Sequence, residues 1–512
     1  MATRKDSAAE LTPSAARKVE IRVAGSPPAR ATVGIPVAIS GAVPADIGLT
    51  RDLLRAAGFD ANVGQAVLLP RRGGRNIVAV GIGAPAELNA ARLRDAAAAF
   101  ARAAGKHSPR LATSLTDVAS VEPAIAGQAV TEGVLLARYN YELKSQPSEP
   151  ALTDLTLVAA KDRLDAVKKG AERGTVLAGA AMLARDLANA PPAYLTAMKM
   201  AEVATRVARG RRLEVEIFDE PALQQMGAGG LLGVNAGSAE PPALVKLTYT
   251  PRARGRNATT NGHLIMVGKG CMYDSGGISL KPSDEVHATM KQDMSGAAAI
   301  LGAMSALSAL DCRTKVTGYL CCTDNMPSGS ATKLGDVLTI YGGKTVEVMN
   351  TDAEGRLLMA DALVLATEEN PDAIVDIATL TGACLRALGP KIAGVMGNNQ
   401  ALIEQVSVAA AETDEPVWEL PMERSYRSTL NSEIADIKNM GGPNGAAIHA
   451  ALFLEDFIGG LPWAHLDIAG PVLVDSDESW RPKGSSGFGA RLLVELALDF
   501  SPPNGATAEA TS

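Results

Sequence analysis

The chain has 512 residues, of which 47% are hydrophobic, and its formal net charge at pH 7 is -7. This length exceeds what one ordinary hydrophobic core serves, so two domains are expected. The negative charge argues against a broad surface for nucleic acid. No stretch approaches the roughly eighteen uninterrupted apolar residues of a membrane span, so no membrane partner is expected.

The cysteines and the N-terminal residues indicate a cytoplasmic protein. Five cysteines, an odd number without any C-x-x-C spacing, are typical of reduced thiols in a cytosolic chain. The first residues lead into no apolar segment of the kind that a secretion signal requires.

The first third of the chain predicts an N-terminal α/β domain over residues 16–160, because short apolar strands alternate with alanine-rich helices. The expected strands are 20–24, 34–40, 65–69, 76–81 and 155–159, and the expected helices are 87–104 and 125–140. The ends of the chain, residues 1–15 and 502–512, are rich in Ala, Ser, Pro and Thr and are expected to be flexible tails.

A long helical pattern over residues 161–190 is expected to connect this domain to the next one. The helix should end there because the residue before Pro191 avoids the helical region.

Residues 191–501 predict a C-terminal α/β/α domain with a central mixed sheet, and the fold class is therefore α/β. The expected strands are 213–218, 244–250, 263–267, 315–322, 345–349, 373–378 and 464–468. The expected helices are 222–232, 296–310, 357–369, 402–412, 446–457 and 488–498. In such sheets ligands bind beyond the carboxyl ends of the strands.

The octapeptide 350–357 follows one of these strands and precedes a helix. If its backbone is extended, Asp352, Glu354 and Arg356 face the same side, which suggests a metal or anion site. The alternative is a capping box, in which Thr351 and Glu354 satisfy free amides at the helix start. Taken alone, this stretch favours capping.

Two more segments concentrate charge at predicted strand and helix ends. Lys269 and Asp274 are placed past the end of the strand 263–267, and flanking glycines allow a bound group to approach the backbone there. The alternative is a simple turn between two surface lysines, Lys269 and Lys281. Asp293 precedes the helix from residue 296 and could simply cap it.

Together these segments supply four carboxylates and two lysines, and such carboxylates would repel one another unless two divalent ions neutralised them. The sequence has no His-x-x-x-His pair and no Gly-x-Ser-x-Gly elbow, so any metal must depend on oxygen ligands. It also lacks the phosphate loop that a nucleotide-binding enzyme would need. Gly355, a poor residue for a first helical turn, would leave room beside a bound ion.

At these residues the chain resembles the leucyl aminopeptidase family, the cytosolic peptidase A type. The octapeptide Asn-Thr-Asp-Ala-Glu-Gly-Arg-Leu at 350–357 is similar to the family signature. Other segments that are similar to family motifs are 186–192, 269–281, 293–298, 379–383 and 463–470. The resemblance covers about residues 180–500, whereas the N-terminal part is similar only in layout.

The resemblance implies a metal-dependent aminopeptidase that releases leucine and other N-terminal amino acids from peptides by a two-metal, bridging-water mechanism. Asp274 and Glu354 would bridge two divalent ions, Mn²⁺ or Zn²⁺, with Mg²⁺ as a further candidate. Asp352 would complete the shell of one ion, and Lys269 and Asp293 that of the other.

The remaining implied roles concern catalysis, substrate and assembly. Lys281 would polarise the scissile carbonyl, and Arg356 would hold a bicarbonate that acts as base. The residues implied to contact the peptide are Met290, Thr379, Leu380 and Gly382. The implied partners are peptides with a free N-terminus and five further copies of the chain in a homohexamer. The alternative is a non-catalytic or DNA-binding regulatory protein on the same fold.

Overall fold

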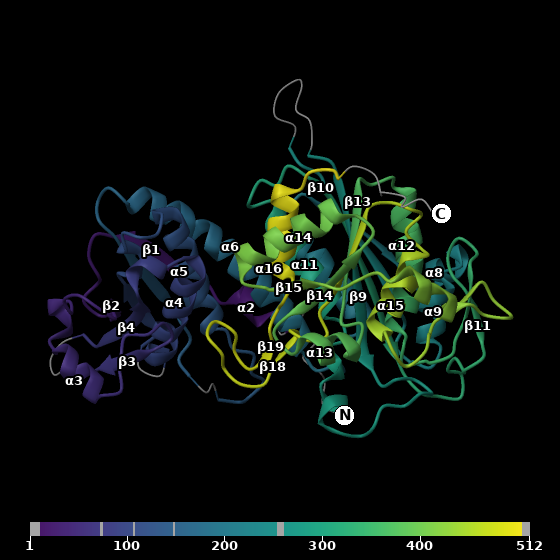
Figure 1. The fold of residues 1–512 in the computed structure, drawn as a ribbon, viewed down its shortest axis with the longest axis horizontal. Helices are drawn as coiled ribbons and strands as arrows, with labels where there is room; N and C mark the ends of the chain where they lie inside the picture. Colours follow the sequence, from purple (N-terminus) through teal and green to yellow (C-terminus); the bar gives the residue numbers. More distant parts are fainter. Residues whose placement is uncertain (1–10, 72–74, 106–107, 147–148, 253–260, 504–512) are drawn as a thin grey trace. The chain divides into compact units, whose positions relative to one another are not determined.

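The computed structural model describes residues 11–71, 75–105, 108–146, 149–252 and 261–503. The chain forms two compact units (Figure 1). One comprises Pro13–Met182 and Val474–Gly484. The other comprises the residues up to Thr12, Leu183–Leu473 and the residues from Ser485 onward. The boundary between them lies within the long helix α6 (Leu164–Asn189).

The two expected tails fall largely outside the described residues, since residues 1–10 and 504–512 are not among them. The described end of the first tail, from Leu11, is structured: Leu11 is buried and Pro13–Ala16 forms the short helix α2.

The N-terminal unit contains a six-stranded sheet in the order β1-β6-β5-β2-β4-β3, in which only the β3–β4 pair is antiparallel. The strands are β1 (Glu20–Ala24), β2 (Thr32–Ala38), β3 (Ala66–Leu69), β4 (Ile77–Gly83), β5 (Arg110–Thr113) and β6 (Asp154–Val158). The helices are α3 (Arg51–Ala56), α4 (Ala90–Gly105) and α5 (Pro123–Ala137). The predicted α/β unit is confirmed, although the sequence pattern does not reveal the four-residue strand β5.

The second unit is built on an eight-stranded sheet in the order β15-β14-β17-β13-β9-β10-β8-β7. The strands are β7 (Leu213–Phe218), β8 (Ala243–Tyr249), β9 (His263–Asp274), β10 (Lys315–Asn325), β13 (Ala373–Ala378), β14 (Ala393–Gly397), β15 (Val417–Glu419) and β17 (Trp463–Asp467). The four central strands β17, β13, β9 and β10 are parallel to one another, whereas β14, β8 and β7 introduce antiparallel pairs. The predicted mixed sheet is therefore confirmed.

Helices cover both faces of this sheet (Figure 1). One face carries α11 (Ser295–Leu307), α14 (Gln400–Thr413) and α16 (Ala490–Asp499). The other face carries α8 (Glu220–Met226), α9 (Gly229–Asn235), α12 (Gly355–Glu368) and α15 (Ala446–Glu455). Apolar side chains such as Met359 of α12 and Phe453 of α15 form a buried core with strand residues such as Ile265.

The remaining elements of this unit are shorter or peripheral. The helices are α7 (Ala197–Ala208), α10 (Glu285–Ala288) and α13 (Gly382–Leu388). A three-stranded sheet is formed by β11 (Val337–Thr339), β12 (Thr345–Glu347) and β16 (Ile437–Lys438), and a two-stranded one by β18 (Leu473–Val474) and β19 (Gly484–Ser485).

Two predicted boundaries are wrong for identifiable reasons. The strand expected to end at Val267 continues to Asp274, because Gly268 and Gly270 interrupt the apolar pattern but still pair with β10. The helix expected over 222–232 is two helices, since Gly227 adopts a left-handed conformation with φ of 77° and ends α8.

This topology brings several strand ends to one edge of the sheet. Because β10, β9, β13 and β17 are parallel, their last residues, Asn325, Asp274, Ala378 and Asp467, lie at the same edge. Among the described residues no helix is both long enough and apolar enough to cross a membrane.

Candidate metal centre

Lys269 lies at the centre of the charged cluster. Its Nζ is 2.7 Å from Asp293 Oδ2 and 2.7 Å from Glu354 Oε1, and it donates a hydrogen bond of 2.9 Å to the carbonyl oxygen of Thr379. The side chain is only 3% exposed. Burial alone would lower the pKa of Lys269, but the surrounding carboxylates outweigh burial and hold that pKa well above its usual value.

A second lysine pairs with the other two carboxylates. Lys281 Nζ is 2.7 Å from Asp274 Oδ2 and also pairs with Asp352 Oδ1. Burial opposes the charged form, but the carboxylates again prevail and raise the pKa of Lys281. The side chain keeps 18% of its exposure, so this ammonium group lies nearer to solvent than that of Lys269. The interpretation of both lysines as surface residues is therefore wrong.

The ligand candidates come from the ends of different elements. Asp274 is the last residue of β9, Asp293 lies two residues before α11, and Glu354 directly precedes α12. The placement of Lys269 and Asp274 beyond a strand end is wrong, because both belong to the extended strand β9. The expected turn after Asp274 does form, since Gly276 N–H donates to Asp274 Oδ1.

The capping interpretations are not supported. Helix α12 does begin at the octapeptide, but no side chain caps it. Thr351 Oγ1 instead donates to Gly276 O and accepts from Ser279 N–H, which ties the two ligand-bearing loops together. Likewise no side chain caps α11, and Asp293 Oδ1 accepts from Thr379 Oγ1 at 2.7 Å.

The octapeptide is also not extended, because a turn includes Thr351 and Asp352. Asp352 and Glu354 consequently pair with different lysines, Lys281 and Lys269.

Gly355 is required by close packing, although the reason differs from the expected one. A Cβ atom at this position would lie 2.8–2.9 Å from Cδ, Cε and Nζ of Lys269. The space that the missing side chain leaves is therefore occupied by the lysine rather than reserved for an ion.

The electrostatics of the cluster fit a divalent cation. Ligand atoms of Cys271, Asp274, Asp293 and Glu354 all lie within 4.8 Å of one another. Glu354 Oε2 is buried and has no hydrogen-bond partner among the described residues. Burial raises the pKa of Glu354 to about 8 and that of Asp293 to about 6. Four carboxylates beside two lysines leave an excess of negative charge that such an ion would neutralise.

Arg356 is buried in the first turn of α12, close in sequence to Glu354, but it forms no ion pair with the carboxylates among the described residues. Its Nη1 donates to the carbonyl oxygen of Asn439 at 2.8 Å, and its Nε has no hydrogen-bond partner among the described residues. Burial lowers the pKa of Arg356 to about 10, which still leaves the guanidinium charged at neutral pH. A buried donor without a partner fits an anion as ligand.

Three of the four predicted substrate-binding residues, Thr379, Leu380 and Gly382, follow β13 directly. Thr379 contacts two ligand candidates, Asp293 through its hydroxyl and Lys269 through its carbonyl. Leu380 N–H donates to Asp467 Oδ1 at 3.2 Å. Gly382 begins α13, where backbone N–H groups lack partners within the helix. Met290 is half-buried at the start of a 3₁₀ turn, Met290–Gln292.

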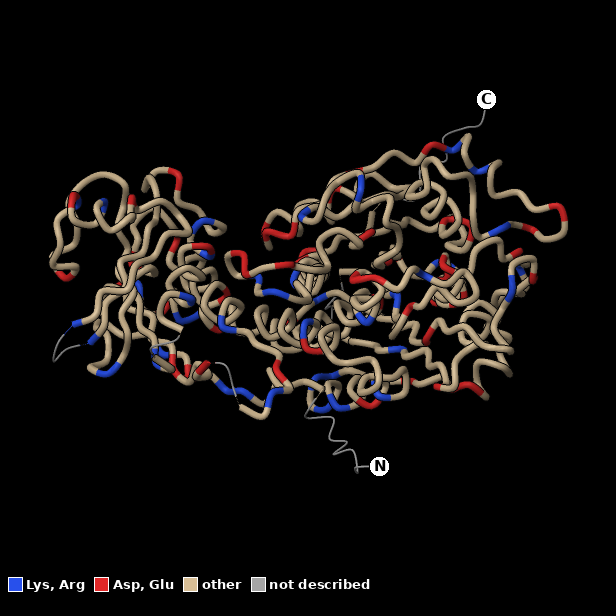
Figure 2. Tube along the Cα trace, turned by 90° about the horizontal axis from the view of Figure 1, so that it is seen from below, with Lys and Arg blue, Asp and Glu red and all other residues tan. Residues whose placement is uncertain are grey.

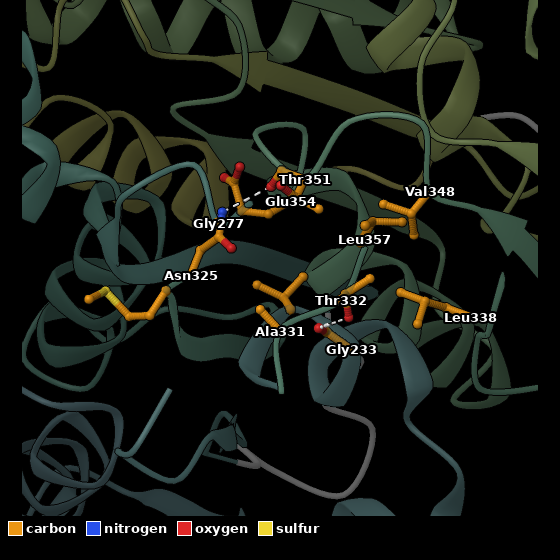
Figure 3. A pocket seen from close by; sticks show the side chains of 12 residues that line it. Gly233, Gly277, Asn325, Ala331, Thr332, Leu338, Val348, Thr351, Glu354 and Leu357 are labelled. Carbon is orange, nitrogen blue, oxygen red and sulfur yellow. Dashed lines mark hydrogen bonds between the residues drawn. The ribbon is translucent and has the colours of Figure 1, made fainter. Parts of the chain in front are cut away.

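A pocket borders the cluster on the side of α9 and β11 (Figure 3). Glu354, Thr351 and Asn325 are polar residues of its lining, as is Thr332, and apolar side chains such as Leu338 also line it. None of the four predicted substrate-binding residues lines it, so this pocket lies behind the cluster rather than at the expected peptide site.

Figure 2 shows where the charged residues lie along the chain. Basic and acidic positions are interspersed along the described parts of both units (Figure 2).

Three side chains that position the site, those of Asn439, Asn325 and Asp467, are not among the residues predicted from the sequence. Asn439 is fully buried; its Oδ1 accepts from the N–H groups of Met349 and Asn350, and its Nδ2 donates to the carbonyls of Asn350 and Ala353. It thereby fixes the loop that carries Asp352 and Glu354, and it also orients Arg356. No sequence signal links Asn439 to this loop.

Asn325 and Asp467 act in a similar way. Asn325 Nδ2 donates to Asp274 Oδ1 at 2.8 Å and to Thr351 O at 2.9 Å. Asp467 accepts from the N–H of Leu380 and from the hydroxyl of Thr381. Asp467 lies in the segment 463–470, which is similar to a family motif. The motif therefore marks the residue, but it does not reveal its role in positioning Leu380 and Thr381.

Two family descriptions match the chain. The cytosol aminopeptidase family, catalytic domain, matches residues 182–494, and the N-terminal domain of the same family matches residues 41–147. A probable cytosol aminopeptidase of Streptomyces avermitilis is 44% identical over 465 residues, which cover 87% of this chain and 88% of that protein. Its counterpart in Streptomyces coelicolor is 43% identical over 473 residues, covering 87% and 89%.

Solved structures show the same fold. The bottromycin maturation enzyme BotP in complex with Mn is 37% identical with a TM-score of 0.82, and the match covers 92% of this chain and 99% of that one. A mutant of tomato leucine aminopeptidase is 30% identical with a TM-score of 0.83, covering 94% and 97%.

The contacts of Asn439 lead to a prediction about metal affinity. Asn439→Ala should weaken Mn²⁺ binding by about 10–100-fold, because the loop that carries two ligand candidates loses its clamp. Elemental analysis during a chelator titration measures the effect. Asn398→Ala is the matched control, since Asn398 likewise bridges two backbone groups, Trp463 N–H and Leu461 C=O, but contacts no ligand candidate. Equal metal affinity in both variants would contradict the clamp.

Proposed function

The chain belongs to the cytosol aminopeptidase family, and on that premise we propose that it releases leucine and other N-terminal residues from peptides at the carboxylate cluster of its C-terminal unit. It is a metallo-exopeptidase of the leucyl aminopeptidase type. The proposed reaction site rests on one observation: five side chains from segments far apart in the sequence lie close together around one buried site. These are Lys269, Asp274, Asp293, Asp352 and Glu354.

These five side chains would hold two divalent ions, with Asp274 and Glu354 between them. The oxygen-rich donor set suits Mn²⁺, Mg²⁺ and Zn²⁺, and a relative of this fold is described in complex with Mn. Bound there, the ions would supply activation of the attacking water and polarisation of the scissile carbonyl. Lys269 would act as a ligand only as a neutral amine, and a nearby divalent charge favours that form by lowering its pKa.

Lys281 is the residue we assign to oxyanion stabilisation. Asp274 and Asp352 hold its ammonium group at the more exposed side of the cluster, where a peptide carbonyl can reach it. A fixed cation in this position stabilises the negative charge that develops on the carbonyl oxygen.

Arg356 would hold a bicarbonate that serves as the base. Its Nε–H, which has no partner in the described part of the chain, and its guanidinium charge would supply an anion site, and the bond to Asn439 O keeps the group in place. The carbonyl of Leu380 and the N–H of Gly382 would align the peptide backbone. Met290 and Thr379 would border the pocket for the first side chain.

A homohexamer in the cytoplasm completes the proposal. Four large apolar side chains on or beside the small sheet β11–β12–β16, namely Leu334, Val337, Met349 and Ile434, are 42–66% exposed, which is a surface that another subunit could cover. The five cysteines are all free, as a reducing compartment requires. A sedimentation mass six times that of one chain would agree with the hexamer, and a monomer would refute it.

Removing the metal should abolish activity. Protein treated with a strong chelator is expected to lose hydrolysis of a leucyl amide, because the carboxylate cluster alone offers no activated water. Addition of Mn²⁺ or Zn²⁺ should restore turnover. Full activity in a preparation that elemental analysis finds metal-free would contradict the proposed function.

Replacing Lys281 should separate catalysis from metal binding. Lys281→Ala is expected to lower kcat by about 10²–10³-fold, the usual effect of losing one oxyanion donor. Its metal content should not fall, since the substitution removes a competing cation from Asp274 and Asp352. Lys333→Ala, at an exposed lysine of the same unit, serves as the control. Unchanged kcat in Lys281→Ala would reject the assignment.

A further inference from the structure

Cys271 lies in β9 between two of the proposed metal ligands. It follows Lys269 by two residues, so the alternation of a strand directs both side chains to the same face of the sheet. The residue is fully buried. Its sulfur lies within 4.8 Å of ligand atoms of Asp274, Asp293 and Glu354.

The ordinary explanation of a buried cysteine is core packing, and Cys271 does contact the apolar core. Two observations set it apart. In the part of the chain that the structure describes, none of the other four cysteines belongs to a comparable cluster of potential ligands. In addition, Glu354, which is 2% exposed, keeps its Oε2 buried in the same cluster without a hydrogen-bond partner.

The spacing allows sulfur and oxygen to share one ion. A zinc ion stands about 2.3 Å from a thiolate sulfur and about 2.0–2.2 Å from a carboxylate oxygen, so two such donors are at most about 4.5 Å apart. The ligand atoms of Cys271, Asp274, Asp293 and Glu354 lie within 4.8 Å of one another, which is the range that shared coordination needs.

We infer that Cys271 is an additional, sulfur donor to one of the two metal positions and makes that position prefer thiophilic cations such as Zn²⁺, Co²⁺ or Cd²⁺ over Mn²⁺ and Mg²⁺. Thiolate sulfur favours the former group, whereas carboxylate and water oxygens suit the latter. On binding, the sulfur–metal bond forms as the thiol proton leaves to solvent, so one proton is released for each ion bound through sulfur. The inference rests on the proposed two-metal site.

Cobalt makes the sulfur donor visible. Purified full-length protein is stripped of metal, loaded with Co²⁺ and examined for a sulfur-to-cobalt charge-transfer band in the near ultraviolet, while elemental analysis reports the cobalt bound. The wild-type protein should show the band. Cys271→Ser, a substitution of nearly the same size, should lose the band and still bind cobalt through the oxygen ligands.

Cys312→Ser is the control for the loss of a buried thiol. Cys312 is 2% exposed, and its sulfur contacts the carbonyl oxygens of Thr314 and Ala497 rather than the carboxylate cluster. This variant should retain the band. Cobalt bound to the wild-type protein without the band, or a band that persists in Cys271→Ser, would overturn the role of Cys271 alone. Failure to bind any divalent ion would overturn the metal site and the proposed function with it.

Competition between metals provides a second measurement that does not depend on spectroscopy. The ratio of Cd²⁺ affinity to Mn²⁺ affinity should fall by roughly tenfold or more in Cys271→Ser. Substitutions of residues around a metal site commonly change metal affinity by this factor. It should stay unchanged in Cys312→Ser. An equal ratio in the wild-type protein and Cys271→Ser would show that the sulfur is not a ligand.

Discussion

The fold of the C-terminal unit brings four carboxylates together at one edge of the sheet, and their mutual repulsion must be offset for the structure to be stable. Asp274, Asp293 and Glu354 are almost fully buried, and such groups are tolerated only when protonated or opposed by cations. Two lysines divide this task, Lys269 in the interior and Lys281 nearer to solvent. Because the lysines leave negative charge in excess, the site is electrostatically complete only with further cations, which accords with the family to which the chain belongs.

Precision in this site comes from amide and hydroxyl groups rather than from the charges themselves. Coulomb attraction has little directional preference, whereas a hydrogen bond does. Asn325 joins the end of β9 to the loop after β12, Asn439 holds that loop along its backbone, and Asp467 fixes the segment after β13. Each of these side chains bonds to backbone groups of a loop that bears a proposed ligand or substrate contact, so hydrogen bonds connect the parallel strand ends with the loops that follow them.

Much of the fold follows from sequence patterning, since long apolar runs and their spacing report burial directly. The pattern predicts the strand Ala373–Ala378 to the residue, and it predicts both units as α/β. The sequence motifs predict which residues form the site but not why they lie where they do. Gly355 illustrates the difference, because its packing partner Lys269 lies 86 residues earlier and only the folded chain shows their contact. Asn439 had no signal at all, because a single asparagine in a loop has many ordinary roles.

Strand β9 shows why periodicity alone could not place the ligands. Lys269 and Cys271 alternate normally, but Asp274 is an odd number of residues further on and would face the opposite side of a regular strand. The pairing with β10 shifts between Thr323 and Asp324, which leaves Met272 as an extra residue, a β-bulge. That one residue restores Asp274 to the face of Lys269 and Cys271. An amine, a thiol and a carboxylate thus reach one site from a single strand. In a regular strand the carboxylate would lie on the opposite face, and the β-bulge brings it to the same face.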